Sequence, residues 1–251
     1  MQAYGPGFAR LYNTKWHGFA EQVAPLIETF FAAASMGREN KSILDLCCGT
    51  GQLARHFLEK GYRVTGLDLS EHMLHYAIEN ARSYVESGQA NFVRGEASRF
   101  VFEERFGLVI SSYDALNHLE NEQALRSCFE CVHAVCDTCF VFDLNTRTGL
   151  NRWNRVNIDD SSEDTFVITR GHYDGEGDKA WNTVTGFVRL PNGVYERCDE
   201  TAFNFVFDLD AVKNTLLELG WKSVHFARIE ELNTPISEPE NEQRVWIVAS
   251  K

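Results

Sequence analysis

Short apolar runs alternate with amphipathic stretches over most of the chain. The runs occupy residues 42–47, 63–69, 90–96, 106–112 and 139–145. Between them, residues 52–61 and 70–86 place apolar side chains at helical spacing. Gly61 closes the first stretch and Ser70 opens the second, which is typical of helix ends. Strands that alternate with helices predict right-handed β-α-β units and a parallel sheet covered on both faces.

The pattern changes between about residues 148 and 208. β-Branched and aromatic residues there form strand-like runs, and "DGEGD" and "PNG" separate them as turns. This segment predicts a small antiparallel sheet inserted into an α/β chain. The earlier pattern then resumes with a helix at 209–220 and strands at 221–229 and 242–250.

Composition and charge narrow the classes of partner. The chain has 251 residues, with 24 Lys plus Arg against 36 Asp plus Glu, a net charge of −12. Such a charge repels a phosphate backbone, so we expect no nucleic-acid partner. No apolar run approaches the roughly 18 residues of a membrane span, and the first residues do not resemble a signal peptide. We therefore expect a cytoplasmic protein that does not bind a membrane.

The cysteines offer one alternative of their own. Four of the seven form two C-x-x-C pairs, at Cys128, Cys131, Cys136 and Cys139. Such pairs resemble a zinc site. However, residues 122–135 are apolar at helical spacing and residues 139–144 form an apolar strand. We therefore expect reduced core thiols and no metal.

The stretch "ILDLCCGTGQLA" at residues 43–54 carries the candidate chemistry. From Gly49 it fits G-x-G-x-x-A, the spacing of a dinucleotide-binding turn. Yet Asp45 ends the preceding strand, where a carboxylate disfavours a pyrophosphate at the following helix N-terminus. Asp45 suits a cationic ligand without phosphate, and S-adenosylmethionine, with its ammonium and sulfonium, is such a ligand.

The next two strands end on acids as well. Asp68 follows Gly51 by 17 residues, a position from which a carboxylate accepts bonds from two ribose hydroxyls. Glu96 lies at the end of the following strand, where it can accept a bond from an adenine amino group. Turn or capping roles remain the alternative for these acids, and NAD enzymes use the same ribose contact.

The successive motifs resemble those of class I S-adenosylmethionine-dependent methyltransferases. They are "ILDLCCGTG", "VTGLDLSEHML", "VRGEAS" and "FGLVISSYDALNHL", in order and at the usual intervals. The resemblance implies a Rossmann-like doubly wound α/β sheet of seven strands, mostly parallel with an antiparallel last strand. It also implies an N-terminal helical cap at 1–40, a core at 41–147 and 209–251, and an inserted antiparallel β lid at 148–208 over the acceptor pocket.

The resemblance further implies the cofactor contacts. The backbone from Gly49 to Gly51, with Asp45, would hold the methionine part, and Asp68 the ribose. Further contacts are expected from Tyr12, Cys47, Leu69, Met73, Glu96, Ala97, Ser111 and Ser112. Met73 is equally expected as a core residue. Cys47 departs from the family, which more often has glycine there, so its backbone must suit a side chain.

The acceptor side is less defined by the sequence. His118 is the candidate general base because of its intrinsic pKa, with Tyr113 beside it, although a purely structural histidine is the alternative. The candidate acceptor contacts are Trp16, Tyr113, Asn117, His118, Arg152 and Trp153. The side-chain directions that would identify the acceptor are not given by the pattern.

The predicted function is methyl transfer from S-adenosylmethionine to a nitrogen or oxygen of a small-molecule acceptor by in-line displacement. Two alternatives remain at this stage, an NAD-dependent oxidoreductase and a non-catalytic protein that binds S-adenosylmethionine. The sequence leaves the acceptor, the need for a base and the oligomeric state open.

Overall fold

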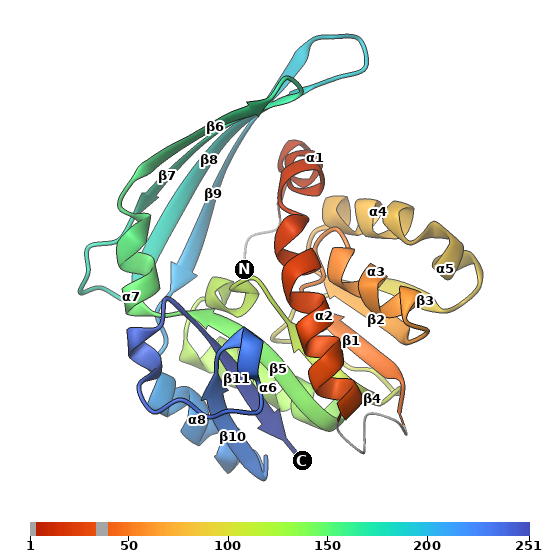
Figure 1. The fold of residues 1–251 in the computed structure, drawn as a ribbon, viewed down its shortest axis with the longest axis vertical. Coiled ribbons are helices and arrows are strands. Elements are labelled where there is room, and N and C mark those ends of the chain that lie inside the picture. The colour runs from red at the N-terminus through yellow and green to blue at the C-terminus, as the bar shows by residue number, and fades with distance from the viewer. Residues whose placement is uncertain (1–3, 34–39) are drawn as a thin grey trace.

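Two β-sheets organise the chain. The computed structural model describes residues 4–33 and 40–251, so residues 1–3 and 34–39 of the predicted cap lie outside the described part. One sheet has seven strands in the order β10-β11-β5-β4-β1-β2-β3, and the other has four in the order β6-β7-β8-β9. Figure 1 shows the second sheet extending away from the first and curving beside α1.

The strands of the larger sheet are β1 (Ser42–Leu46), β2 (Arg63–Asp68), β3 (Ala90–Arg94), β4 (Phe106–Ser111), β5 (Cys136–Asn145), β10 (Ser223–Ala227) and β11 (Arg244–Ser250). The smaller sheet contains β6 (Val156–Ser162), β7 (Thr165–His172), β8 (Lys179–Arg189) and β9 (Tyr195–Phe205). The α-helices are α1 (Pro6–Lys15), α2 (Gly18–Ala33), α3 (Gln52–Glu59), α4 (Glu71–Asn80), α5 (Arg82–Glu86), α6 (Glu122–Val135), α7 (Arg147–Leu150) and α8 (Leu209–Glu218). The 3₁₀ helices are η2 (Ala115–His118), η3 (Asn151–Trp153), η4 (Ile229–Glu231) and η5 (Pro239–Asn241).

The pairing of the strands confirms the predicted fold class. β1 lies between β2 and β4 and pairs with both in parallel. β11 runs antiparallel to its neighbours β5 and β10. The inserted strands β6 to β9 pair antiparallel throughout. The larger sheet is therefore mostly parallel with an antiparallel last strand, and the smaller one is a separate antiparallel sheet.

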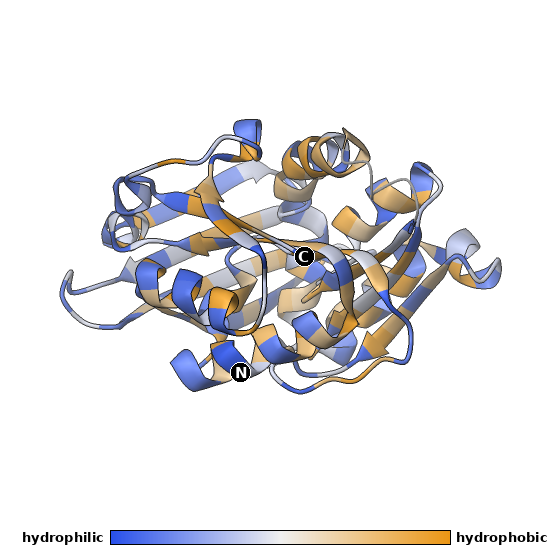
Figure 2. Cartoon of the chain, turned by 90° about the horizontal axis from the view of Figure 1, so that it is seen from below, coloured by the Kyte–Doolittle hydropathy of each residue, from blue (hydrophilic) through white to orange (hydrophobic). Residues whose placement is uncertain are grey.

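Hydrophobic clusters cover both faces of the larger sheet. Leu44 and Leu46 of β1 point into one cluster, which also contains side chains from α6 and α8. Ile43 points into the other, with side chains from α2 and α3. Alternate residues of a strand face opposite sides, so this division follows from the strand geometry. In Figure 2 the helices carry both hydrophobic and hydrophilic residues, as expected for helices that each bury one face.

Local signals set several helix ends as predicted. The Ser70 hydroxyl accepts a bond from the backbone N–H of Met73 and caps α4. Gly61, just beyond α3, has a φ of 84°. The predicted single helix over 70–86 is wrong in one respect, because it breaks at Ala81 into α4 and α5. Near this break the Asn80 side chain donates to the Thr50 carbonyl and to Asn13, and so ties the end of α4 to the loop after β1.

Helix α1 packs between α4 and the smaller sheet. Phe8 and Leu11 of α1 lie in one cluster with Met73 of α4 and with Val184 and Val188 of β8. The aromatic stripe of the N-terminal segment is therefore partly a packing surface. The predicted division of the chain at 148 and 208, and the role of the inserted segment as a lid, stay predictions.

The four cysteines of the C-x-x-C pairs belong to α6 and β5. Cys128 and Cys136 are buried in one core cluster, whereas Cys139 is buried in the other. Among residues 4–33 and 40–251, no group of three or more His, Cys, Asp or Glu side chains is arranged to hold a metal ion. In the same residues, no helix is long and apolar enough to cross a membrane.

Candidate active site

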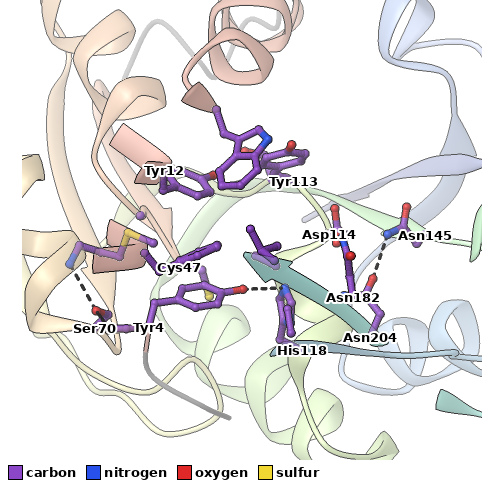
Figure 3. A pocket seen from close by; sticks show the side chains of 18 of the residues that line it. Tyr4, Tyr12, Cys47, Ser70, Tyr113, Asp114, His118, Asn145, Asn182 and Asn204 are labelled. Atoms are coloured by element: carbon purple, nitrogen blue, oxygen red, sulfur yellow. Dashed lines mark hydrogen bonds between the residues drawn. The ribbon is translucent and has the colours of Figure 1, made fainter. Parts of the chain in front are cut away.

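A cavity of about 500 Å³ lies at the carboxyl ends of the central strands, below the smaller sheet. Residues that follow β1, β2 and β3 form one side of it, which we call the strand-end wall: Cys47, Gly49, Asp68, Leu69 and Ala97. Asparagines from β5, β8 and β9 form the opposite side, which we call the amide wall: Asn145, Asn182 and Asn204. Figure 3 shows the two sides, with Tyr4, His118 and Tyr113 between them. Ligands of open α/β sheets bind at this edge.

Asp68 is held in place by the backbone of its own wall. One carboxylate oxygen accepts from the Gly49 N–H at 2.9 Å and the other accepts from the Ser70 N–H at 2.9 Å. Burial raises the pKa of Asp68, while these amides oppose that shift. Each oxygen retains a lone pair, so a carboxylate fixed in this way can accept further bonds from a ligand in the cavity.

Asp45 lies behind the same loop. It is 2% exposed, and its Oδ2 atom has no hydrogen-bond partner among the described residues. Burial, with the charge of Asp68 as a smaller cause, raises the pKa of Asp45 to about 7. Asp45 lines a small adjoining cavity, and both cavities are lined by Tyr12, Trp16 and Cys47. A buried carboxylate without a partner fits a cationic ligand group placed nearby.

Backbone strain gathers around the cavity. The non-glycine residues with positive φ, among those described, are Cys47 at 62°, Tyr113 at 66° and Asp114 at 50°. All three line the cavity. The left-handed region is unfavourable for such residues, and strain of this kind clusters at functional sites. The Cys47 backbone is thus one that glycine would adopt more easily, as the departure from the family pattern suggested.

Helix α1 supplies aromatic rings to the cavity. Tyr12 lies close to Gly49, since a Cβ added to Gly49 would be 3.7 Å from the Tyr12 ring. The rings of Tyr12 and Trp16 have centroids 5.9 Å apart, and Tyr12 and Tyr113 are 6.3 Å apart. Burial raises the pKa of Tyr12 well above its usual value, so its hydroxyl stays protonated and can donate. These rings line the cavity beside the loop that follows β1.

His118 has a defined protonation pattern. Its Nδ1 atom lies 2.7 Å from the Phe203 carbonyl oxygen, which can only accept, so Nδ1 carries the hydrogen. Burial lowers the pKa of His118. In the neutral ring, Nε2 is therefore unprotonated, and it lies 3.4 Å from the Tyr4 hydroxyl. This arrangement leaves a basic nitrogen beside the cavity.

Hydrogen bonds of the asparagine side chains connect the amide wall. Asn204 Nδ2 donates to the Phe203 carbonyl at 3.4 Å, which turns its Oδ1 atom toward Asn145. Asn145 Nδ2 donates to that oxygen at 2.9 Å (Figure 3). The Oδ1 atom of Asn182 is buried without a partner among the described residues. This side of the cavity therefore offers amide groups that can accept and donate hydrogen bonds.

A charged cluster supports the loop between the two walls. Arg244 of β11 pairs with Asp143 of β5 and, at 2.7 Å, with Asp114. The Asp114 N–H also donates to Asp143 at 2.9 Å. The guanidinium lies 5.5 Å from the centre of the Tyr113 ring, which stacks on Phe19 at 4.4 Å. These contacts hold the strained residues Tyr113 and Asp114 in place.

The structure brings most of the predicted site residues to one cavity. Its lining includes Tyr12, Trp16, Cys47, Gly49, Asp68, Leu69, Met73, Ala97, Ser112, Tyr113, His118 and Trp153. Five others lie behind or beside it: Asp45, Gly51, Glu96, Ser111 and Asn117. Asn117 is fully buried and bonds to backbone groups of Asn145 and Phe205. Arg152 is exposed, and its neighbour Arg155 lines the cavity instead.

The lining also includes residues that the sequence did not predict for the site, among them Tyr4, Asp114, Asn145, Asn182, Asn204 and Arg244. Asp114 stood in the predicted motif "SSYDALNHL", so its polar, strand-end position was a usable signal. Tyr4 belonged to the aromatic N-terminal segment. Nothing in the local pattern around Asn182, Asn204 or Arg244 distinguishes them from surface polar residues.

A seven-stranded, mostly parallel sheet with a cavity at the carboxyl ends of its central strands is typical of Rossmann-like cofactor-binding α/β proteins. Residues 43–137 match the sequence family described as "Methyltransferase domain". A provisionally named methyltransferase of Geobacillus sp. (strain WCH70) is 29% identical over 219 residues, which cover 86% of this chain and 87% of that protein.

Solved structures share the fold over nearly the whole chain. An S-adenosylmethionine-dependent methyltransferase from Clostridium acetobutylicum ATCC 824 superposes with a TM-score of 0.77, at 20% identity and 97% coverage of both chains. The sugar N-methyltransferase KedS8 from Streptoalloteichus sp. ATCC 53650 gives 0.74, at 16% identity, covering 100% of this chain and 95% of that one. Residues 43–137 therefore match a methyltransferase domain, and the fold shared over the rest of the chain supports the predicted class I S-adenosylmethionine-dependent methyltransferase family, whose cofactor is S-adenosylmethionine.

Proposed function

We propose that this protein transfers a methyl group from S-adenosylmethionine to a nitrogen or oxygen of a small molecule bound below the inserted sheet. The observation that carries the proposal is one cavity with two chemically different sides. The strand-end wall presents a fixed carboxylate and apolar surfaces, and the amide wall presents polar groups. Its volume of about 500 Å³ lies in the range of small-molecule sites.

The strand-end wall fits the cofactor. Asp68, oriented by the Gly49 and Ser70 amides, would accept bonds from the ribose hydroxyls. Leu69, Met73 and Ala97 would contact the adenine. Asp45 and the Gly49 to Gly51 backbone would hold the methionine part. The unpartnered Oδ2 atom of Asp45 supports this assignment, because a buried carboxylate gains most from a cationic partner.

S-adenosylmethionine supplies a methyl group on a positively charged sulfur, which is a strong leaving group. The protein's own contribution is then position, exclusion of water and removal of a proton. The rings of Tyr12, Trp16 and Tyr113 cover the reacting region. His118 Nε2 would take a proton from an acceptor that arrives protonated.

The remaining finer predictions belong to this proposal. The sugar N-methyltransferase among the solved structures supports a small-molecule acceptor. The inserted segment would act as a lid, and contacts of α1 with the smaller sheet support a joint cap over the cavity. Cytoplasmic location and the absence of nucleic-acid and membrane partners stay predictions from the sequence.

A calorimetric titration with S-adenosylmethionine and with S-adenosylhomocysteine tests the proposal. We expect saturable binding of both, and labelled methyl transfer to at least one compound of a small-molecule panel. Absence of heat and of a thermal shift with either ligand would overturn it, and binding of NADH in their place would revive the oxidoreductase alternative. Cofactor binding without product across a broad panel would favour the non-catalytic alternative.

A further inference from the structure

We propose that the methyl acceptor is a hydroxylated small-molecule amine, with its nitrogen near Asp114 and His118 and its hydroxyls on the amide wall. This inference rests on the proposed methyltransferase function and names the substrate class of the same cavity. Three features of the acceptor side carry it: unpaired amide groups, the carboxylate of Asp114 and a basic nitrogen on His118.

The amide wall presents hydrogen-bonding groups that the described residues leave unpaired. The bond from Asn204 to the Phe203 carbonyl sets the orientation of Asn204, so Asn145 must donate its Nδ2 hydrogen to Asn204. The Asn145 Oδ1 atom then has no donor among the described residues. Asn182 Oδ1, on strand β8, is buried and has no partner among the described residues. Leaving such oxygens unpaired is costly, so they favour a ligand that brings O–H or N–H groups.

The charge on this side is negative. Asp114 shares the single guanidinium of Arg244 with Asp143, so its carboxylate is only partly neutralised. Asp114 is 9% exposed and lines the cavity, whereas Asp143 is fully buried. An ammonium group is attracted to such a site, and a carboxylate or phosphate is repelled. The charge therefore distinguishes an amine from an acid.

The neutral His118 completes the chemistry that an amine needs. An amine bound as an ammonium must lose a proton before it attacks, and His118 Nε2 accepts that proton directly or through the Tyr4 hydroxyl. The nitrogen electron pair then forms the N–C bond to the methyl group. The C–S bond breaks and its electron pair stays on sulfur. The products are the methylated ammonium, S-adenosylhomocysteine and one proton on His118.

The acceptor side does not fit two other classes equally well. An apolar acceptor would leave the buried Asn182 oxygen without a partner. An acidic acceptor would need a cation, and Arg244 is already paired twice. Arg155 is exposed at the edge of the cavity, where solvent screens its charge.

Binding to the protein saturated with S-adenosylhomocysteine tests the inference. The probes are an amino sugar, an aminocyclitol and an amino alcohol, each beside analogues in which a hydroxyl or a carboxylate replaces the amine. Affinities are measured by saturation-transfer NMR titration at pH 7.5. We expect at least one amine to bind ten times or more tightly than both of its analogues.

Substitutions in strand β8 test whether Asn182 contributes to binding of the amine. Asn182→Leu removes the unpartnered oxygen and should weaken binding of that amine fivefold or more, while Asn182→Asp should strengthen it. Thr183→Val is the matched control, since Thr183 bonds to Thr201 and is not part of the cavity lining. It should change binding by less than twofold.

The outcomes separate this inference from the function on which it rests. If S-adenosylhomocysteine binds but no amine exceeds its analogues, the substrate class is wrong and the methyltransferase function stands. Equal effects of Asn182→Leu and Thr183→Val would also overturn the inference. Failure of S-adenosylhomocysteine to bind would overturn the proposed function itself.

Discussion

The two sides of the cavity are built in opposite ways. In the strand-end wall, backbone amides of Gly49 and Ser70 fix the carboxylate of Asp68, so the loop and the functional group support each other. In the amide wall, side chains hold side chains, as in the bond from Asn145 to Asn204. One side is built at the ends of consecutive parallel strands, and the other joins side chains of β5 with side chains of the inserted sheet.

This difference matches what each side has to bind. A wall made of backbone amides and glycines keeps its geometry when surface residues change, which suits one invariant ligand. A wall made of side chains on an inserted sheet changes its ligand with single substitutions. The Arg244 cluster joins the two, because it anchors Tyr113 and Asp114 to β5 and β11.

The largest expected effect is on the free energy of unfolding, and it tests the ion-pair cluster of Arg244. Arg244→Met leaves Asp143 buried without its cation, and breaking a buried ion pair in this way typically costs about 3–5 kcal/mol of folding free energy. Chemical denaturation measures the change. Adding Asp143→Asn to the variant should recover part of the loss, because it removes the unpaired charge. Arg228→Met, in an exposed pair with Glu242, is the control and should change little. An Arg244→Met protein as stable as the wild type would show that this cluster does not stabilise the fold.

The next effect tests the strand-end wall. Asp68→Ala removes hydrogen bonds to a charged group, each typically about 1.5–3 kcal/mol, so we expect S-adenosylhomocysteine to bind about 100-fold more weakly. Calorimetry measures the affinity. Cys47→Gly, in the same wall, keeps the carboxylate and should lose far less. Equal losses in the two variants would contradict the ribose role of Asp68.

The same contrast explains what the sequence could predict. Asp45, Asp68 and Ala97 lie in consecutive β-α units, where parallel strands bring their ends together, so order and spacing were enough. Asn182, Asn204 and Arg244 come together only through the packing of β8, β9 and β11, which no local pattern encodes. Asn117 was predicted at the acceptor, yet its side chain bonds to backbone groups of Asn145 and Phe205. Its amide has the right chemistry for either role, and only packing decides between them.

A third prediction concerns pH. Because the pKa of Asp45 is raised to about 7 by burial, the carboxyl is mostly protonated below that pH in the free protein. The cationic S-adenosylmethionine favours the ionised form, so affinity should fall as pH decreases through 7. At pH 6 about a tenth of the molecules are ionised, which weakens apparent binding about tenfold. Calorimetric titrations between pH 6 and 8 measure how the affinity for S-adenosylmethionine depends on pH.

The Asp45→Asn variant is the control for that slope, because it cannot ionise and should bind with little dependence on pH. The contribution of Asp45 to folding stability depends on pH in the opposite direction from its contribution to binding. The folded protein holds this proton more tightly than the unfolded chain, so this group makes folding less favourable as pH rises from about 4 to 7. A variant that keeps the full pH dependence of binding would assign the effect to another group.

The smallest expected effect separates the two adjacent cysteines. Cys47 has a φ of 62°, and the left-handed region costs a non-glycine residue about 1–2 kcal/mol. Cys47→Gly removes that strain, but it also loses a partly buried thiol and makes the unfolded chain more flexible by about 0.4–1 kcal/mol. These terms nearly cancel, so we expect a change in unfolding free energy below about 1 kcal/mol. Cys48 is buried and does not have a positive φ. Cys48→Gly therefore relieves no backbone strain and should lower the free energy of unfolding clearly more than Cys47→Gly does. Denaturation of both variants measures the difference, and equal losses would mean that the Cys47 backbone is not strained.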